Sequence, residues 1–210
     1  MYITLIFAGD TNLQVMKMNR KDILFYALLI AVTTIIKIVC SPNLALSGTT
    51  GIMAVALFAG MNNNYKKANS FILPLLTLLI TNTILQVLYA FNIFPFSGFY
   101  KWQFVEYSLV ILLTSLGLLF RKTKTAGVFI SAVAGPTVFF FISNFIVWAA
   151  SSGLTGTTGY THDFAGLVDC YTRALPFYRN SLISTVVLLP VLIMAYHWIV
   201  KGKAGLALAD

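Results

Sequence analysis

Side chains able to do chemistry are few in this chain and are scattered among long apolar runs. The candidate ligand-binding residues are Asn43, Asn82, Gln86, Glu106, Asn144, Trp148, Tyr160, His162, Arg179 and Asn180. Carboxamides, a carboxylate and aromatic rings orient small molecules in pockets whose walls are otherwise apolar. If the fold brings these residues together, they form a ligand-capture site.

A catalytic set is the alternative interpretation. His162, Asp163 and Arg173 form a conceivable acid–base group for a membrane enzyme with an external active site. The sequence contains no HExxH, no GxSxG, no glycine-rich phosphate loop and no His/Cys cluster with metal-ligand spacing. We therefore predict no catalytic residue, cofactor or metal. Any transport would draw its energy from a gradient or from a partner protein.

The composition indicates which elements must position these side chains. Hydrophobic residues make up 59% of the 210 residues and charged residues only 10%, whereas soluble domains have about 25% charged residues. Such a chain is solvated mainly by lipid. Apolar stretches of near-spanning length predict an all-α integral membrane bundle of six helices, at Ile23–Cys40, Leu44–Met61, Ser70–Tyr89, Phe104–Phe120, Gly127–Ala150 and Leu182–Val200. Gly48 and Gly51 indicate that the outer end of the second stretch is a loop folded into the protein.

Basic residues orient the bundle. One side carries Lys17, Arg20, Lys21, Lys66, Lys67, Arg121, Lys122, Lys124, Lys201 and Lys203. The other side carries only Lys101, Arg173 and Arg179. This bias predicts a multi-pass protein of the bacterial inner (cytoplasmic) membrane with both termini inside. The net charge of +8 therefore reflects a membrane partner and does not indicate nucleic acid.

With this orientation, every predicted helix turns polar toward its outer end, and the inner halves are nearly all aliphatic or aromatic, with His197 as the main exception. Asn82 and Gln86, four residues apart, share one helix face. The long segment Ser151–Ser181 is expected to be an external loop that covers the pocket with Tyr160 and His162. The shared depth of the polar residues predicts an outward-facing site.

Several of these residues have a simpler interpretation. Asn, Gln and Ser also hold membrane helices together, and Trp102 and Trp148 suit a membrane interface. Lys37 and Glu106 either pair with each other or Lys37 extends outward to the interface. Cys40 and Cys170 define no redox compartment; Cys40 is a packed thiol or, if it faces outward, a ligand for a soft metal.

The chain is expected to form a single domain over residues 19–203. Residues 1–18 are interpreted as an N-terminal extension, with Met16 or Met18 as a candidate natural start, and residues 204–210 as a C-terminal tail.

Three segments resemble the motifs of one family. Pro42-Asn43 followed by Gly51–Gly60 resembles "PNF…(A)ALFGG", and Phe140–Trp148 resembles "FFLITNFGVW". Gly166–Leu182 resembles "GL..CY..A.PFFRN.L". Together they resemble an uncharacterised family of small bacterial membrane proteins, a domain of unknown function. That family is similar to the substrate-binding S components of energy-coupling-factor (ECF) vitamin transporters.

The resemblance implies an S-component-like six-helix fold with an external vitamin pocket. It also implies that Ala27 and Ala31 contact an energy-coupling transmembrane subunit, which works with ATPases. Two positions depart from the family pattern: Leu44 replaces a Phe, and Asn82 stands where a Ser-Asp pair is expected, which removes a carboxylate from the third helix.

The leading hypothesis is therefore a membrane subunit that binds a small, vitamin-like nutrient for uptake. The alternatives are the membrane enzyme described above and a ligand-free structural or assembly protein, for which the polar layer should be satisfied internally without a cavity.

Overall fold

The computed structural model describes residues 19–62, 67–123, 125–151 and 159–202. Its α-helices are α1 (Arg20–Cys40), α2 (Ile52–Met61), α3 (Ile72–Ala90), α4 (Gln103–Leu119), α5 (Thr125–Ala149) and α6 (Phe164–Tyr196). A 3-10 segment, η1 (Lys67–Phe71), precedes α3, and a π-helix, η2 (His197–Lys201), continues α6. The predicted all-α class is confirmed for this part of the chain. The proposed extension and tail, residues 1–18 and 204–210, lie outside the described residues.

In the part of the chain that the structure describes, four helical segments are long and apolar enough to cross a membrane: Arg20–Cys40, Asn69–Ala90, Thr125–Ala149 and Phe164–Lys201. They indicate a membrane protein. The other two predicted spans correspond to shorter apolar helices, α2 with 10 residues and α4 with 17 residues.

Lipid as solvent explains the outer surface of α1. Leu24, Leu28, Val32, Ile35 and Val39 recur at helical spacing along α1, and each is about half exposed or more. Water would penalise such a continuous apolar stripe, whereas hydrocarbon does not. The protein interior lies on the opposite face, where Phe25, Tyr26 and Leu29 are buried.

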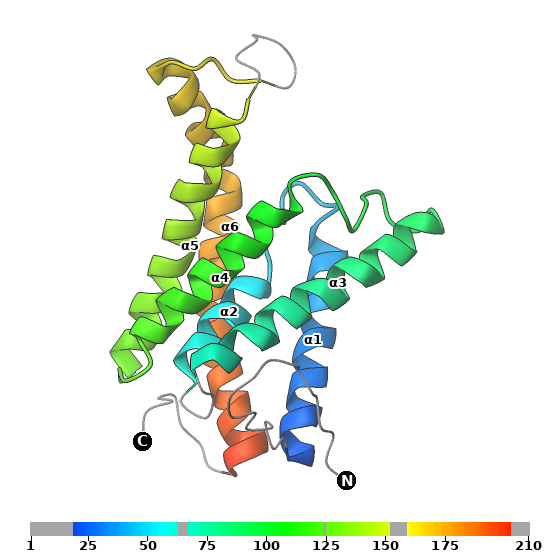
Figure 1. The fold of residues 1–210 in the computed structure, drawn as a ribbon, viewed down its shortest axis with the longest axis vertical. Coiled ribbons are helices and arrows are strands. Elements are labelled where there is room, and N and C mark those ends of the chain that lie inside the picture. Colours follow the sequence, from blue (N-terminus) through cyan, green and yellow to red (C-terminus); the bar gives the residue numbers. More distant parts are fainter. Residues whose placement is uncertain (1–18, 63–66, 124, 152–158, 203–210) are drawn as a thin grey trace, which may run out of the picture.

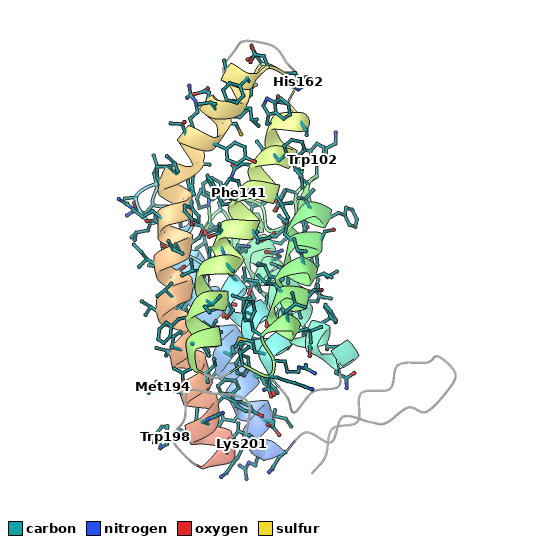
Figure 2. All side chains as sticks on the ribbon, turned by 90° about the vertical axis from the view of Figure 1, so that its left-hand side faces the viewer. Trp102, Phe141, His162, Met194, Trp198 and Lys201 are labelled. Atoms are coloured by element: carbon teal, nitrogen blue, oxygen red, sulfur yellow. The ribbon has the colours of Figure 1, made fainter. Side chains whose placement is uncertain are left out.

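Helices α1, α5 and α6 run roughly along the long axis of the molecule, whereas α3 and α4 are strongly inclined to it (Figure 1). The start of α1 and the end of α6 lie at the same end, at the bottom of Figure 1. At the top, α5 and α6 form a hairpin that rises beyond the tops of α1, α3 and α4 (Figure 1). Figure 2 accordingly shows His162 at one end of the molecule and Trp198 and Lys201 at the other.

The centre of the bundle is the short helix α2, in which every residue is buried. It packs against α3, α4, α5 and α6. Toward the end of the bundle that carries Lys201, the ring of Phe58 lies 5.7 Å from Phe25 and 5.4 Å from Tyr196 (ring centroids), at separations typical of favourable aromatic pairs. A helix that is apolar all round suits this fully enclosed position.

The prediction of a helix from Leu44 was wrong, since α2 begins at Ile52. The residues before it form turns, as the paired glycines suggested. Gly48 has φ +90°, and a Cβ atom there would lie 2.5 Å from the backbone oxygen of Phe177. The turn therefore packs directly on the backbone of α6, where a side chain would not fit.

The prediction of an external loop over Ser151–Ser181 was also wrong for most of its length. Helix α6 begins at Phe164, so Phe164–Ser181 extends the predicted sixth helix at its N-terminal end. The Asp163 side chain accepts a hydrogen bond from the Gly166 backbone N–H and caps the new first turn. With 33 residues, α6 is about 50 Å long, longer than the hydrocarbon layer is thick.

The closest helix crossing depends on Gly60 of α2 and Gly117 of α4. A Cβ atom at Gly60 would lie 2.2 Å from the backbone oxygen of Thr114 and 2.8 Å from the Gly117 Cα. Because both contacts are to backbone, neither can yield by a side-chain rotation.

We therefore expect Gly60→Ala to destabilise the protein by about 1–3 kcal/mol, as overpacking does. The measurement is the thermal unfolding midpoint in detergent. Leu119→Ala, at a highly exposed position of α4, is the matched control and should unfold near the wild-type temperature. Equal midpoints for the two variants would contradict the close crossing.

Candidate functional site

A polar network joins the C-terminal halves of α1 and α3 to the first turn of α4. The Lys37 ammonium donates to the Asn82 side-chain oxygen at 2.9 Å and to Glu106 Oε1 at 3.4 Å. The Tyr100 hydroxyl donates to Glu106 Oε2 at 3.0 Å. The Lys37 and Glu106 side chains are only 24% and 19% exposed. Of the two alternatives for Lys37, the structure shows pairing with Glu106.

Next to this network, α1 and α3 make a second polar contact. The Thr34 and Thr81 hydroxyls share a hydrogen bond of 2.9 Å. Asn82 is almost fully buried, and its amide nitrogen makes no hydrogen bond of good geometry among the described residues. Its oxygen fixes the Lys37 ammonium, so Asn82 positions a charge although the carboxylate expected there is absent.

The network borders a cavity of about 440 Å³ between the N-terminal half of α4 and the C-terminal half of α5, within the range of small-molecule sites. Its polar walls are Glu106, Ser143 and Ser151. Its aromatic walls are Tyr100, Trp102, Phe139 and Tyr160. The aliphatic residues Val105 and Leu109 of α4, Ile146 and Val147 of α5, and Ala150 just after α5 complete the lining.

Phe139 connects this cavity to the core below it. It lines the cavity and also packs against the buried cluster that contains Ile52 and Met53. The N-terminal end of α2 therefore lies next to the cavity.

Burial and, after it, the Glu106 carboxylate raise the pKa of Tyr100 above its usual range. The phenol therefore stays protonated and remains a hydrogen-bond donor to Glu106 at neutral pH. Burial also raises the pKa of Tyr160, so the second cavity tyrosine stays neutral as well.

The tip of the α5–α6 hairpin holds Tyr160 at the cavity. The Trp148 indole donates to the Thr161 carbonyl at 2.9 Å. Ser151 Oγ donates to the Tyr160 carbonyl at 2.8 Å and lies 3.3 Å from His162 Nε2. Trp148 and His162, both predicted ligand contacts, thus position the segment that carries Tyr160.

Other predicted site residues form hydrogen bonds with neighbouring turns. Gln86 accepts hydrogen bonds from the Ser97 hydroxyl and the Phe99 backbone N–H. Asn43 accepts from the Ala45 N–H within its own turn. These side chains fix loops outside the cavity lining.

The Asn180 amide donates to the carbonyls of Ala45 and Ser47, at 2.8 Å each. The Ser181 hydroxyl donates to the Gly48 carbonyl at 2.8 Å. Side chains of α6 thereby provide hydrogen-bond donors for backbone carbonyls in the non-helical segment before α2. Arg179, its neighbour, is exposed and does not line the cavity.

Asn144 lies on a smaller cavity of about 180 Å³ between α5 and α6. Its amide donates to the Phe140 carbonyl at 2.7 Å. The two cavities share Phe139 and Ser143, so Asn144 is close to the main site without lining it.

Of the predicted set, Glu106 and Tyr160 line the main cavity and Asn82 reaches it through Lys37. Sequence reasoning assigned Trp102 to the membrane interface and did not single out Ser143 or Ser151. Trp102, Ser143 and Ser151 meet at the main cavity only because α4 and α5 cross there. No residue spacing in the sequence indicates that crossing.

The conceivable acid–base residues make separate contacts. Arg173 pairs with Asp169 on an exposed face of α6, at 2.8 Å. Asp163 accepts from the Thr161 hydroxyl and the Gly166 N–H, which lower its pKa. Among the described residues, no group of three His, Cys, Asp or Glu side chains could hold a metal. Cys40 and Cys170 are free thiols.

Ala27 and Ala31 lie on the exposed face of α1, between the lipid-facing residues Leu24 and Val32. This small-residue pair leaves a shallow place on that face at which another helix could approach closely.

The fold and surface define a helical membrane protein. The model of a family of unknown function, DUF6580, matches residues 17–206, and the chain belongs to this family. The predicted membership of an uncharacterised membrane family is confirmed. No curated protein and no solved structure matches the chain.

The structure makes Lys37 and Glu106 energetically interdependent. We expect Lys37→Met to lower the unfolding midpoint by the equivalent of about 2 kcal/mol, because it leaves a largely buried carboxylate without its cation. In Lys37→Met/Glu106→Gln neither charge remains, so the loss should be smaller than the sum of the single losses.

Arg173→Ala, which breaks an exposed pair, is the control and should leave the midpoint unchanged. Strict additivity of the two single losses would contradict the coupling.

Proposed function

We propose that this protein is a substrate-binding membrane subunit that captures a small nutrient from outside the cell for uptake. The cavity carries the proposal, because aromatic and aliphatic walls surround one fixed carboxylate in a space of about 440 Å³. A ligand-free structural role would need no such space. An enzyme would need converging acid–base groups, and His162 and Arg173 contact different partners.

The proposed orientation places the cavity on the external side of the cytoplasmic membrane. The basic residues that favour the inside include Arg20, Arg121 and Lys201, and the start of α1, the end of α4 and η2 all lie in the half of the molecule away from the hairpin tip (Figure 1). The positive-inside bias then puts both termini in the cytoplasm and the cavity outside.

We also propose an energising partner, because the family resembles the S components of ECF transporters, which work with such a partner. The exposed Ala27 and Ala31 on α1 form the surface that an energy-coupling transmembrane subunit, driven by ATPases, would contact. Capture by the cavity and coupling through α1 are separate properties, so binding is tested on the purified subunit alone.

The binding test is a thermal-shift screen of water-soluble vitamins and their precursors on the detergent-purified protein. A ligand at about a hundred times its dissociation constant stabilises the folded state by about 2.7 kcal/mol. Ala150→Trp places an indole in the cavity lining, whereas Ala149→Trp changes the neighbouring exposed residue that does not line it.

A hit should stabilise the wild type and Ala149→Trp but not Ala150→Trp, and deletion of the gene should abolish uptake of that compound. The proposal fails if no compound stabilises the protein and uptake survives the deletion.

A further inference from the structure

Three of the hydroxyl groups that line the main cavity, those of Tyr100, Ser143 and Ser151, already donate their hydrogens. Tyr100 donates to Glu106, and Ser143 and Ser151 each donate to a backbone carbonyl. What these groups still offer a ligand is acceptor capacity.

Glu106 is the strongest of these acceptors. A carboxylate has about four lone-pair positions, and Tyr100 and Lys37 occupy one each. Lys37 is anchored primarily on Asn82, at 2.9 Å, and its contact with Glu106 is longer, at 3.4 Å. Glu106 therefore keeps room for a donor that approaches from the cavity.

The charge of the lining has one sign. Among the described residues that form the cavity wall, Glu106 is charged and none is Lys, Arg or His. Lys37 reaches Glu106 from α1 and is not part of the lining. An anionic ligand would meet a carboxylate there and find no cation.

The aromatic rings suit a positive charge as well. Tyr100, Trp102, Phe139 and Tyr160 surround the cavity, and the faces of such rings attract cations within about 6 Å. Figure 2 shows Trp102 toward the end of the molecule that carries His162.

We infer that the cavity selects a small organic cation with an aromatic or apolar body, whose positive group binds Glu106 and lies among the aromatic rings. This inference rests on the proposed capture function and adds the chemical class of its ligand. Lys37 is a positioning residue: it holds Glu106 in place and competes with the ligand for the same carboxylate.

The test uses three probes of similar size: the cation N-methylquinolinium, the neutral 4-methylquinoline and the anion quinoline-4-carboxylate. Each is titrated at pH 8 by calorimetry into the full chain in phosphatidylcholine nanodiscs, which carry no net lipid charge. N-methylquinolinium should bind at least tenfold more tightly than the neutral probe, and the anion should not bind.

Two variants separate recognition from folding. Glu106→Gln should weaken N-methylquinolinium binding about tenfold and leave the neutral probe within about threefold, because only the charged contact is lost. The retained neutral binding reports an intact cavity. Lys37→Met should strengthen cation binding several-fold, since it removes the competing ammonium; a purely structural pair would instead weaken binding of every probe in both variants.

The possible failures are distinguishable. Preference for the neutral or anionic probe, or an unchanged cation affinity in Glu106→Gln, overturns the inference about charge and leaves the capture function standing. Absence of binding by all three probes overturns the inference, and the capture function fails with it only if the vitamin screen is also empty.

Discussion

Backbone polar groups at membrane depth must find partners inside the protein, and this constraint organises the bundle. Helix α2 has 10 residues, about 15 Å of helix, so the chain reaches it through turns whose carbonyls need donors. Asn180 and Ser181 of α6 supply those donors, and Gly48 lets the turn approach α6.

Helix α2 begins only at Ile52, so its N-terminal end lies below the space between α4 and α5. Phe139 contacts both, so the shortness of α2 and the presence of the cavity are linked.

The largely buried carboxylate of Glu106 is the charged group of the cavity lining. Lys37, Asn82 and Glu106 come from three different helices, and pairing lets two charges remain in a mostly apolar setting at an acceptable free energy. Asn82 contributes the oxygen that orients Lys37, so the charge balance of the site rests on one lysine and one glutamate. Tyr100 fixes the other carboxylate oxygen. The result is an oriented acceptor beside aromatic walls.

Composition and apolar length predicted the all-α membrane class and placed α1, α3, α4 and α5 within a few residues, because hydrocarbon imposes a length and a polarity that a sequence shows directly. The segment from Phe164 to Ser181 was missed because charges such as Asp169 and Arg173 indicate the end of a span, although a helix can continue into water. Glu106 and Tyr160 were found by polarity and depth. Trp102 and Ser143 were not, because the crossing of α4 and α5 is a tertiary feature that no local pattern encodes.

The central claim, a cavity open to the outside of the cell, is tested most directly by thiol labelling of intact cells. In a Cys40→Ala/Cys170→Ala background, Ser151→Cys places one thiol in the cavity wall and Lys201→Cys one at the opposite end of the bundle. A membrane-impermeant maleimide is expected to label Ser151→Cys in intact cells and to label Lys201→Cys only after permeabilisation. The reverse pattern, or labelling of neither variant before permeabilisation, would contradict it.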